Sequence, residues 1–308
     1  MRNTKKGSGF LKNKNGDSLI ADFIIYFLFA VFTLICILPF YYIFINTISD
    51  NSLVSKGQIM FVPQGIHFGN YAKVFAMKGL PRAALISVAR TVLGTGLTVV
   101  GTSFLGYAMA RKEYWMHKLW YRFIVITMYF NAGIIPWFIN MKNLGLLDSF
   151  FAYIIPGMVS PFYLILFKTY VESIPAELEE SAELDGAGYL IRYLRIIMPV
   201  STSMIATIAI FTGVGQWNSF TDTLFLVSSS KLYTLQYVLY QYLNEADAIA
   251  ATLRNSSSAA AGASIANALT ATSVRMTITI VVVVPVMLIY PFFQRYFVKG
   301  IMIGAVKG

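Results

Sequence analysis

The chain has 308 residues, of which 57% are hydrophobic and only 12% are charged. Such a small number of charged residues cannot cover the surface of a water-soluble globule of this size. The composition therefore excludes a soluble protein and predicts a polytopic membrane protein. The formal net charge of +10 is compatible with a nucleic-acid partner, but Lys and Arg lie beside apolar runs, which indicates the positive-inside bias of membrane proteins instead.

Cysteine and histidine are too few to build the usual disulfide and metal sites. Cys36 is the single cysteine, so we expect no disulfide within the chain. The two histidines, His67 and His117, are far apart in sequence, so we expect no metal site. The sequence contains no G-x-x-x-x-G-K-[ST], no H-E-x-x-H and no G-x-S-x-G, so we expect no P-loop and assign no catalytic residue.

The N-terminal 19 residues are polar and basic, and an apolar run follows at Phe23–Ile48. This run is too long for a signal peptide and lacks a small-x-small cleavage site, so we predict a first membrane span with the N-terminus inside. The second predicted span, Ala84–Ala110, is rich in small residues that permit close helix packing. Arg90 lies near its outer end, where we expect it to snorkel or pair, with a substrate role as the alternative.

Further apolar runs predict four more spans. We expect them at Trp120–Met141, Phe150–Tyr170, Val200–Val227 and Ser273–Phe297. Pro156, Gly157 and Pro161 should kink the fourth span. Residues 228–272 then form an outer segment, too polar and small to form a core, and Ala246–Ala271 is almost all Ala, Ser, Asn and Thr. Six spans put both termini inside, where Lys and Arg are more numerous.

An acidic stretch, Glu172–Pro199, separates the fourth and fifth predicted spans and holds six of the fourteen acidic residues. A carboxylate in hydrocarbon costs about 2.5–3.5 kcal/mol even on a lenient scale, so this stretch must project into water. Its residues predict a short helix, a bend at Gly186 and Gly188, and a second helix before Pro199. On residue chemistry alone, a solvated amphipathic helix on the membrane surface remains an alternative to a docking element.

Several residues of this stretch have a recognisable spacing: Glu180-Ser181-Ala182, Gly186, Ile196 and Pro199. This spacing resembles the EAA loop of permease subunits of ATP-binding-cassette importers, with Ser181 in place of Ala and Met198 in place of Leu. The surrounding residues resemble the carbohydrate branch of that family in particular. They are Pro175, Leu178, Glu179 and Leu184-Asp185-Gly186-Ala187.

The resemblance implies that this loop is a coupling helix, docked in a groove of a separate cytoplasmic ATPase. ATP and Mg would then be bound by that partner, and this chain would need no cofactor and would be no enzyme. The residues to which the resemblance assigns coupling are Glu179, Glu180, Ser181, Ala182, Asp185, Gly186 and Pro199.

A set of polar and aromatic residues in otherwise apolar spans suggests a route for a polar solute. It consists of Tyr129, Asn131, Gln216, Trp217, Asn218 and Phe220. Rings can contact the C–H faces of a sugar and amides its hydroxyls; the alternative is an interfacial aromatic belt with amides bridging helices. Trp217-Asn218-x-Phe220 resembles the Trp-Asn-x-Phe pattern of sugar permeases, which favours the route, whereas Trp137 and Tyr163 fit either role.

From residue 18 to 308 the chain resembles the smaller permease of maltose-type carbohydrate importers, nearest to permeases for fragments of complex polysaccharides. The resemblance implies an all-α membrane protein with the type I permease fold, six transmembrane helices and cytoplasmic termini. It implies a cytoplasmic tail at 1–19 and a permease domain at 20–308, with a cytoplasmic coupling loop at 172–199 and an extracellular loop at 228–272. The implied activity is import of a carbohydrate, an oligosaccharide, across the cell membrane.

The partners that the resemblance implies are a second permease subunit in a heterodimer, two cytoplasmic ATPase subunits, an extracellular substrate-binding protein and membrane lipid, with no nucleic acid. The last residues resemble a Gly-Gly-Val-Lys-Gly terminus that reaches between the ATPases, which assigns Gly304, Lys307 and Gly308 to that interface. Alternatives are a permease for an amino acid or ion, a secondary transporter, and a membrane-embedded enzyme. The lack of acidic residues in predicted spans three, four and six argues against a proton relay.

Overall fold

The computed structural model describes residues 16–244, 272–289 and 291, and within these ranges the chain is helical, without any β-strand. The helices are, in chain order, α1 (Gly16–Thr47), α2 (Asn51–Ser55), α3 (Gly69–Phe75), α4 (Leu80–Ala110), α5 (His117–Tyr129), α6 (Ile134–Asn143), η1 (Phe150–Tyr153), α7 (Pro161–Glu172), α8 (Glu177–Leu184), α9 (Tyr189–Arg192), η2 (Tyr193–Ile197), α10 (Met198–Val200), α11 (Thr202–Asn218), α12 (Thr221–Leu226) and η3 (Ser230–Leu232). Residues 235–244 and Thr272–Ile289 are also helical.

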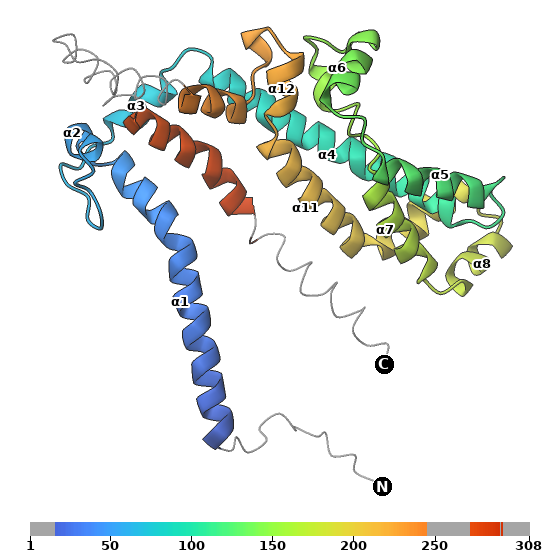
Figure 1. Ribbon diagram of the computed structural model, residues 1–308. Helices are drawn as coiled ribbons and strands as arrows, with labels where there is room; N and C mark the ends of the chain where they lie inside the picture. The colour runs from blue at the N-terminus through green and yellow to red at the C-terminus, as the bar shows by residue number, and fades with distance from the viewer. Residues whose placement is uncertain (1–15, 245–271, 290, 292–308) are drawn as a thin grey trace.

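Helix α1 is apolar on all sides and extends away from the rest of the molecule (Figure 1). In the most apolar 18 residues of its Ala21–Thr47 segment, no residue is buried. Large side chains such as Phe27, Phe29 and Phe32 are exposed. A helix that is apolar all round needs a non-aqueous environment, so this surface suits lipid or another apolar chain.

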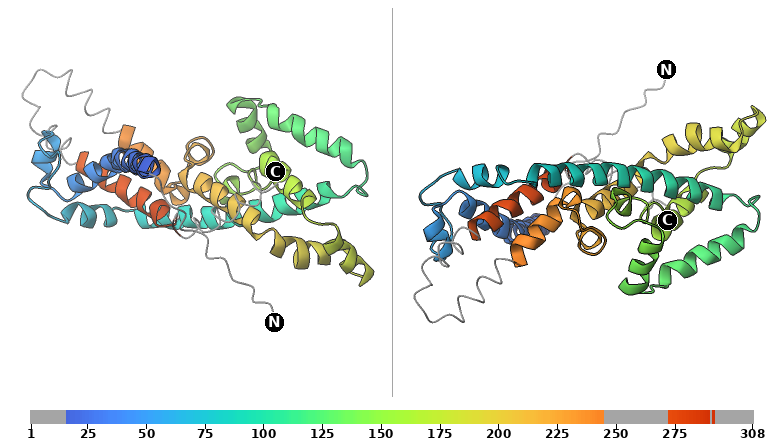
Figure 2. Two further views of the ribbon diagram at one scale, coloured as in Figure 1. Left: turned by 90° about the horizontal axis from the view of Figure 1, so that it is seen from below. Right: turned by 90° about the horizontal axis from the view of Figure 1, so that it is seen from above.

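Helix α4 is the longest element of the body, which it crosses from the side of α3 to the side of α8 (Figures 1 and 2). It packs against α7 and α11. Small residues make these contacts close, as expected for this span: a Cβ added at Gly101 would lie 2.8 Å from the carbonyl oxygen of Met158, and one at Gly106 3.1 Å from that of Leu164.

Three of the predicted continuous spans are interrupted, which corrects the sequence-based expectation. Residues 130–133 separate α5 from α6, residues 154–160 separate η1 from α7, and Ser219 and Phe220 separate α11 from α12. Gly133, directly before α6, has a φ of +84°, a conformation that a helix passing through this position could not have. The kinks expected around Pro156 and Pro161 lie at the second of these breaks.

Three described helices are long and apolar enough to cross a membrane: Ala21–Thr47, Leu80–Ala110 and Thr272–Ile289. A fourth crossing results if Tyr189–Val200 and Thr202–Asn218, which meet at 81°, form one broken span. The breaks described above explain why the other predicted spans do not appear as single helices.

The segment at 228–272, predicted to lack core residues, contributes to the core in its described part, so the expectation was wrong for residues 235–244. Within residues 235–244, Leu235 and Leu239 are buried against Ile278 and Val282 of the Thr272–Ile289 helix. The stretch Ala246–Ala271 and the tail residues Gly304, Lys307 and Gly308 lie outside the described residues.

Candidate functional site

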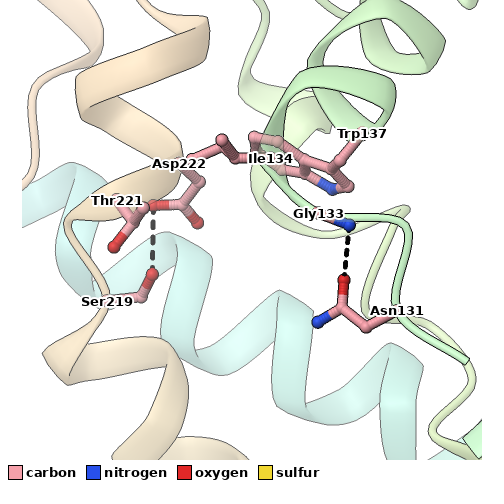
Figure 3. Close-up of a pocket in the computed structure, with 7 residues that line it drawn as sticks. All are labelled: Asn131, Gly133, Ile134, Trp137, Ser219, Thr221 and Asp222. Atoms are coloured by element: carbon pink, nitrogen blue, oxygen red, sulfur yellow. Dashed lines mark hydrogen bonds between the residues drawn. The ribbon is translucent and has the colours of Figure 1, made fainter. Parts of the chain in front are cut away.

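Two adjoining cavities lie where the broken helices meet beside α4. The first cavity, of about 460 Å³, lies between the α5–α6 break and the α11–α12 break (Figure 3). It is lined by Asn131, Gly133, Ile134, Trp137, Ser219, Thr221 and Asp222. The other, of about 320 Å³, extends towards α7 and shares Trp137, Ser219 and Asp222 with the first. Discontinuous helices commonly build solute sites inside membrane proteins, because their freed backbone groups line a cavity.

Arg90 holds the wall of the second cavity together, and its expected pairing is confirmed. The residue is 1% exposed, and its Nη2 lies 2.5 Å from Oδ2 of Asp222. Its Nη1 donates to Oδ1 of the same carboxylate at 3.1 Å and to the carbonyl oxygen of Ser219 at 3.2 Å. The guanidinium also lies 4.5 Å from the ring centroid of Tyr153. The pair is bidentate, so charge and geometry both fix α4 to the α11–α12 break.

Gln216 completes this network from α11. Its Oε1 accepts hydrogen bonds from Arg90 Nε at 3.2 Å and Nη2 at 3.0 Å, and its Nε2 donates to the Tyr153 carbonyl at 3.3 Å. A Cβ at Gly94 would lie 2.8 Å from Gln216 Nε2, so a larger residue there would displace the amide from this position. Polar atoms therefore reach the cavity from α4, α11 and the segment around η1.

The structure brings only part of the predicted route residues to these cavities. Asn131 and Gln216 line them, whereas Tyr129 is 79% exposed and not among the lining residues. Trp217 lies in the core, where its Nε1 donates to the carbonyl oxygen of Val282 at 3.0 Å. Successive helical residues differ by about 100° in direction, so Gln216 and its neighbours cannot share one face.

The remaining two route residues contact the helix at 235–244. Asn218 is exposed and its Oδ1 accepts from Gln236 Nε2 at 2.9 Å, and the Phe220 ring stacks on Tyr240 at 4.7 Å. The sequence reasoning did not select Asp222 or Tyr153 as site residues. The signal for Asp222 was present, since an acid within one apolar run and Arg90 within another are expected to pair.

A second site is the acidic helix α8, which has two different faces. Glu180 and Ser181 are exposed, as is Asp185 directly after the helix, and Leu184 is 90% exposed, whereas Glu179 is only 5% exposed and Ala182 is half-buried. Glu177, Glu179 and Glu180 occupy the first turn, where the helix dipole favours negative charge.

The bend after α8 is made by Gly186, which has a φ of +81°. Beyond it the chain enters α9 and continues through η2 to α10, where Pro199 occupies an early helical position. The short helix, glycine bend and second helix predicted from the sequence are therefore present. Among the described residues, no three His, Cys, Asp or Glu side chains gather as metal ligands would.

Comparison with known proteins is consistent with this geometry. Residues 102–303 match the family model described as "Binding-protein-dependent transport system inner membrane component". The chain is 31% identical over 298 residues to the polygalacturonan/rhamnogalacturonan transport system permease protein YtcP of Bacillus subtilis, covering 97% of this chain and 100% of that protein. It is 32% identical to protein LplC of the same organism, over 89% of this chain and 90% of LplC.

A solved structure also has this fold. It is the crystal structure of a bacterial ABC transporter involved in the import of the acidic polysaccharide alginate, and one of its chains superposes with a TM-score of 0.81 at 28% identity. The match covers 93% of this chain and 99% of that chain. The resemblance identified from the acidic loop is thereby confirmed. The chain belongs to the family of binding-protein-dependent inner membrane components, the permease subunits of ATP-binding-cassette transporters.

Proposed function

We propose that this chain is a permease subunit of an importer that moves a carbohydrate, an oligosaccharide, into the cytoplasm. The observation that carries this proposal is the pair of cavities at the helix breaks, which combine aromatic rings with hydrogen-bonding groups. Trp137 and Tyr163 offer ring faces and Asn131 an amide group for hydroxyls, while Gln216 and Asp222 make the wall around them polar. The names of YtcP and of the alginate importer, which refer to polysaccharides, support the same substrate class.

Transport needs contacts that orient the solute and still release it. Most of the hydrogen-bonding capacity of Arg90 and Gln216 is used within the protein, so these residues shape the wall and leave weak contacts for a passing sugar. Asn131 Oδ1 accepts from the Gly133 amide at 2.9 Å, which holds the α5–α6 break beside the cavity (Figure 3). Its amide nitrogen is left to point towards a solute.

The topology that we propose has six crossings with both termini in the cytoplasm. The broken pairs α5–α6, η1–α7 and α11–α12 would each form one crossing, in addition to α1, α4 and the helix at Thr272–Ile289. Residues 172–199 would then be cytoplasmic and residues 228–272 extracellular. The positive-inside bias of the sequence supports this orientation.

We propose that α8 is the coupling helix and that its exposed face docks on a cytoplasmic ATPase. Glu180, Ser181 and Asp185 are available for that contact, while Ala182, Gly186 and Pro199 shape the helix and its exit. The full assembly would hold a second permease, two ATPases that bind ATP and Mg, and an extracellular binding protein. Gly304, Lys307 and Gly308 would reach the ATPase interface, and this chain would hold no cofactor.

The test is transport by the assembled complex in lipid vesicles. Labelled oligosaccharides should accumulate only with ATP on the ATPase side and binding protein on the other side, and Asn131→Ala should slow uptake without preventing assembly. Labelled amino acids serve as the comparison substrate. Uptake that survives ATP removal and collapses with an uncoupler would indicate a secondary transporter, and uptake of amino acids alone would indicate another branch of the family.

A further inference from the structure

Two ion pairs, each with one buried partner, involve the same uninterrupted helix. Arg90 lies within α4 and pairs with Asp222 at the cavities, while Arg111 directly follows Ala110, the last residue of α4. Twenty-one positions separate the two arginines, which corresponds to about 32 Å along a helix at 1.5 Å per residue. The α4 helix therefore joins the cavity wall to the neighbourhood of α8 (Figures 1 and 2).

At the second pair, Glu179 of α8 turns inwards to α4. Its Oε1 accepts from Arg111 Nη2 at 2.7 Å, and its Oε2 accepts from the Tyr107 hydroxyl at 3.3 Å. The Glu179 side chain is 6% exposed, and the Arg111 guanidinium lies 4.9 Å from the centroid of the Tyr107 ring. Both carboxylate oxygens are thus held by residues at one end of α4. Glu179 is 5% exposed, so little of its surface remains to contact a docked protein.

This contact gives α8 a direct connection to α4 that the chain path does not provide. Along the chain, α8 follows α7 through residues 173–176 only, and its other ion pair, Glu183 with Arg192 at 2.8 Å, leads forward to α9. Glu183 is 62% exposed, so that pair is more strongly screened by water than the pair of Glu179 and Arg111. Rigid helices with buried polar contacts at both ends can carry a displacement between two sites.

We propose that Glu179 and Arg111 are positioning residues that tie α8 to α4, so that α4 carries the displacement of α8 to the Arg90–Asp222 cavity wall. This inference rests on the proposed docking of α8 on an ATPase. Glu179 would pass the movement of α8 on to α4, and the exposed residues of α8 would make the contact with the ATPase. Without the contact between Glu179 and Arg111, ATP hydrolysis should no longer be coupled to the opening and closing of the cavities.

The test uses the assembled complex with a reporter cysteine in a Cys36→Ser background. Thr221→Cys places an exposed thiol at the first cavity, where its labelling by an aqueous thiol reagent can be followed with and without ATP. We expect labelling to change with ATP in the parent complex. With Glu179→Gln the change should disappear and uptake should fall about tenfold, while ATP hydrolysis and assembly persist.

Glu172→Gln is the matched control, because it removes a carboxylate from an exposed pair with Lys168 within α7 alone. It should leave labelling and uptake unchanged. The reversed pair Arg111→Glu with Glu179→Arg should recover the ATP-dependent labelling that each single change abolishes. This recovery separates positioning from a general loss of folding, since a misfolded single variant would not be repaired by its partner.

Several results would overturn the inference. It fails if Glu179→Gln retains the ATP-dependent labelling, if the control loses it equally, or if Glu179→Gln does not assemble and the reversed pair fails to restore assembly and labelling. The labelling depends on ATP and not on the identity of the solute. If the parent complex shows the labelling change but imports no carbohydrate, the proposed substrate class is contradicted, whereas the contact between α8 and α4 is still supported when Glu179→Gln abolishes the change and the reversed pair restores it.

Discussion

Arg90 and Asp222, which are 132 positions apart in the sequence, meet in a bidentate ion pair that joins α4 to the break between α11 and α12. The arginine is almost fully buried, and the Asp222 side chain is 16% exposed. Such a pair fixes the geometry of the cavity wall more than it stabilises the fold, because much of the Coulomb attraction offsets the desolvation of two charges.

Asp222→Asn should destabilise the protein strongly, because it leaves the Arg90 guanidinium buried without a counter-charge. Breaking one partner of a buried pair costs about 3–5 kcal/mol. The thermal unfolding midpoint of the purified complex in detergent should fall clearly. Glu172→Gln, which breaks the exposed pair with Lys168, should change the free energy of unfolding by less than about 1 kcal/mol. Equal midpoints for the two variants would contradict this prediction.

Gly101→Ala should loosen the contact between α4 and the segment before α7. Its Cβ would lie 2.8 Å from the Met158 carbonyl oxygen, a backbone atom that cannot swing away. Overpacking of this kind costs about 1–3 kcal/mol. Gly96→Ala on the same helix provides the control, since a Cβ there meets nothing within 4 Å. Thermal midpoints of both variants measure the difference, and a Gly101→Ala midpoint equal to that of Gly96→Ala would show that the segment yields.

Gly186→Val should leave the chain inserted in the membrane but abolish transport. Valine has room at this position, because a Cβ at Gly186 meets nothing within 4 Å. The obstacle is the φ of +81°, which costs an L-residue about 1–2 kcal/mol. The bend between α8 and α9 would then shift. Gly188→Val, at an ordinary φ of −69°, is the control and should transport normally. Normal uptake by Gly186→Val would remove the bend from the mechanism.

Glu180→Lys should differ in kind from Glu179→Gln. Glu180 is exposed on the proposed docking face of α8, so reversing its charge should weaken recruitment of the ATPase and eliminate transport. Co-purification of the ATPase with the permease in detergent measures recruitment directly. Glu179→Gln should retain the ATPase in the same experiment, and wild-type recruitment by Glu180→Lys would exclude Glu180 from the docking contact.

Trp217→Phe tests whether this residue is core or pathway. The indole N–H bonds to the Val282 carbonyl in a buried cluster, so Phe should cost about 0.5–1.5 kcal/mol by removing that hydrogen bond. We expect a lower thermal midpoint with little change in the apparent affinity for the transported solute. Trp115→Phe, at a 72% exposed tryptophan, should leave the midpoint unchanged. An altered affinity at normal stability would return Trp217 to the pathway, as its sequence pattern predicts.

The local features of this chain could be predicted from its sequence because they depend on neighbouring residues. The acidic helix, the bend at Gly186 and the second helix follow from charge and glycine placement within about thirty residues. The close packing of α4 followed from its small residues. Hydropathy windows were less reliable for spans three to five, since averaging over twenty residues does not detect breaks of two to seven residues.

The sequence by itself determined the family, the membrane character and the existence of an acidic helix between two apolar runs. Only the tertiary structure decided which side chains meet: Asp222 with Arg90, Glu179 with Arg111, and Trp217 with the core. The two partners of each ion pair lie 132 and 68 positions apart, and no local pattern encodes such pairing. A helix distributes consecutive residues over different faces, so the roles of Glu179 and Glu180, one buried and one exposed, depend on how α8 lies against α4.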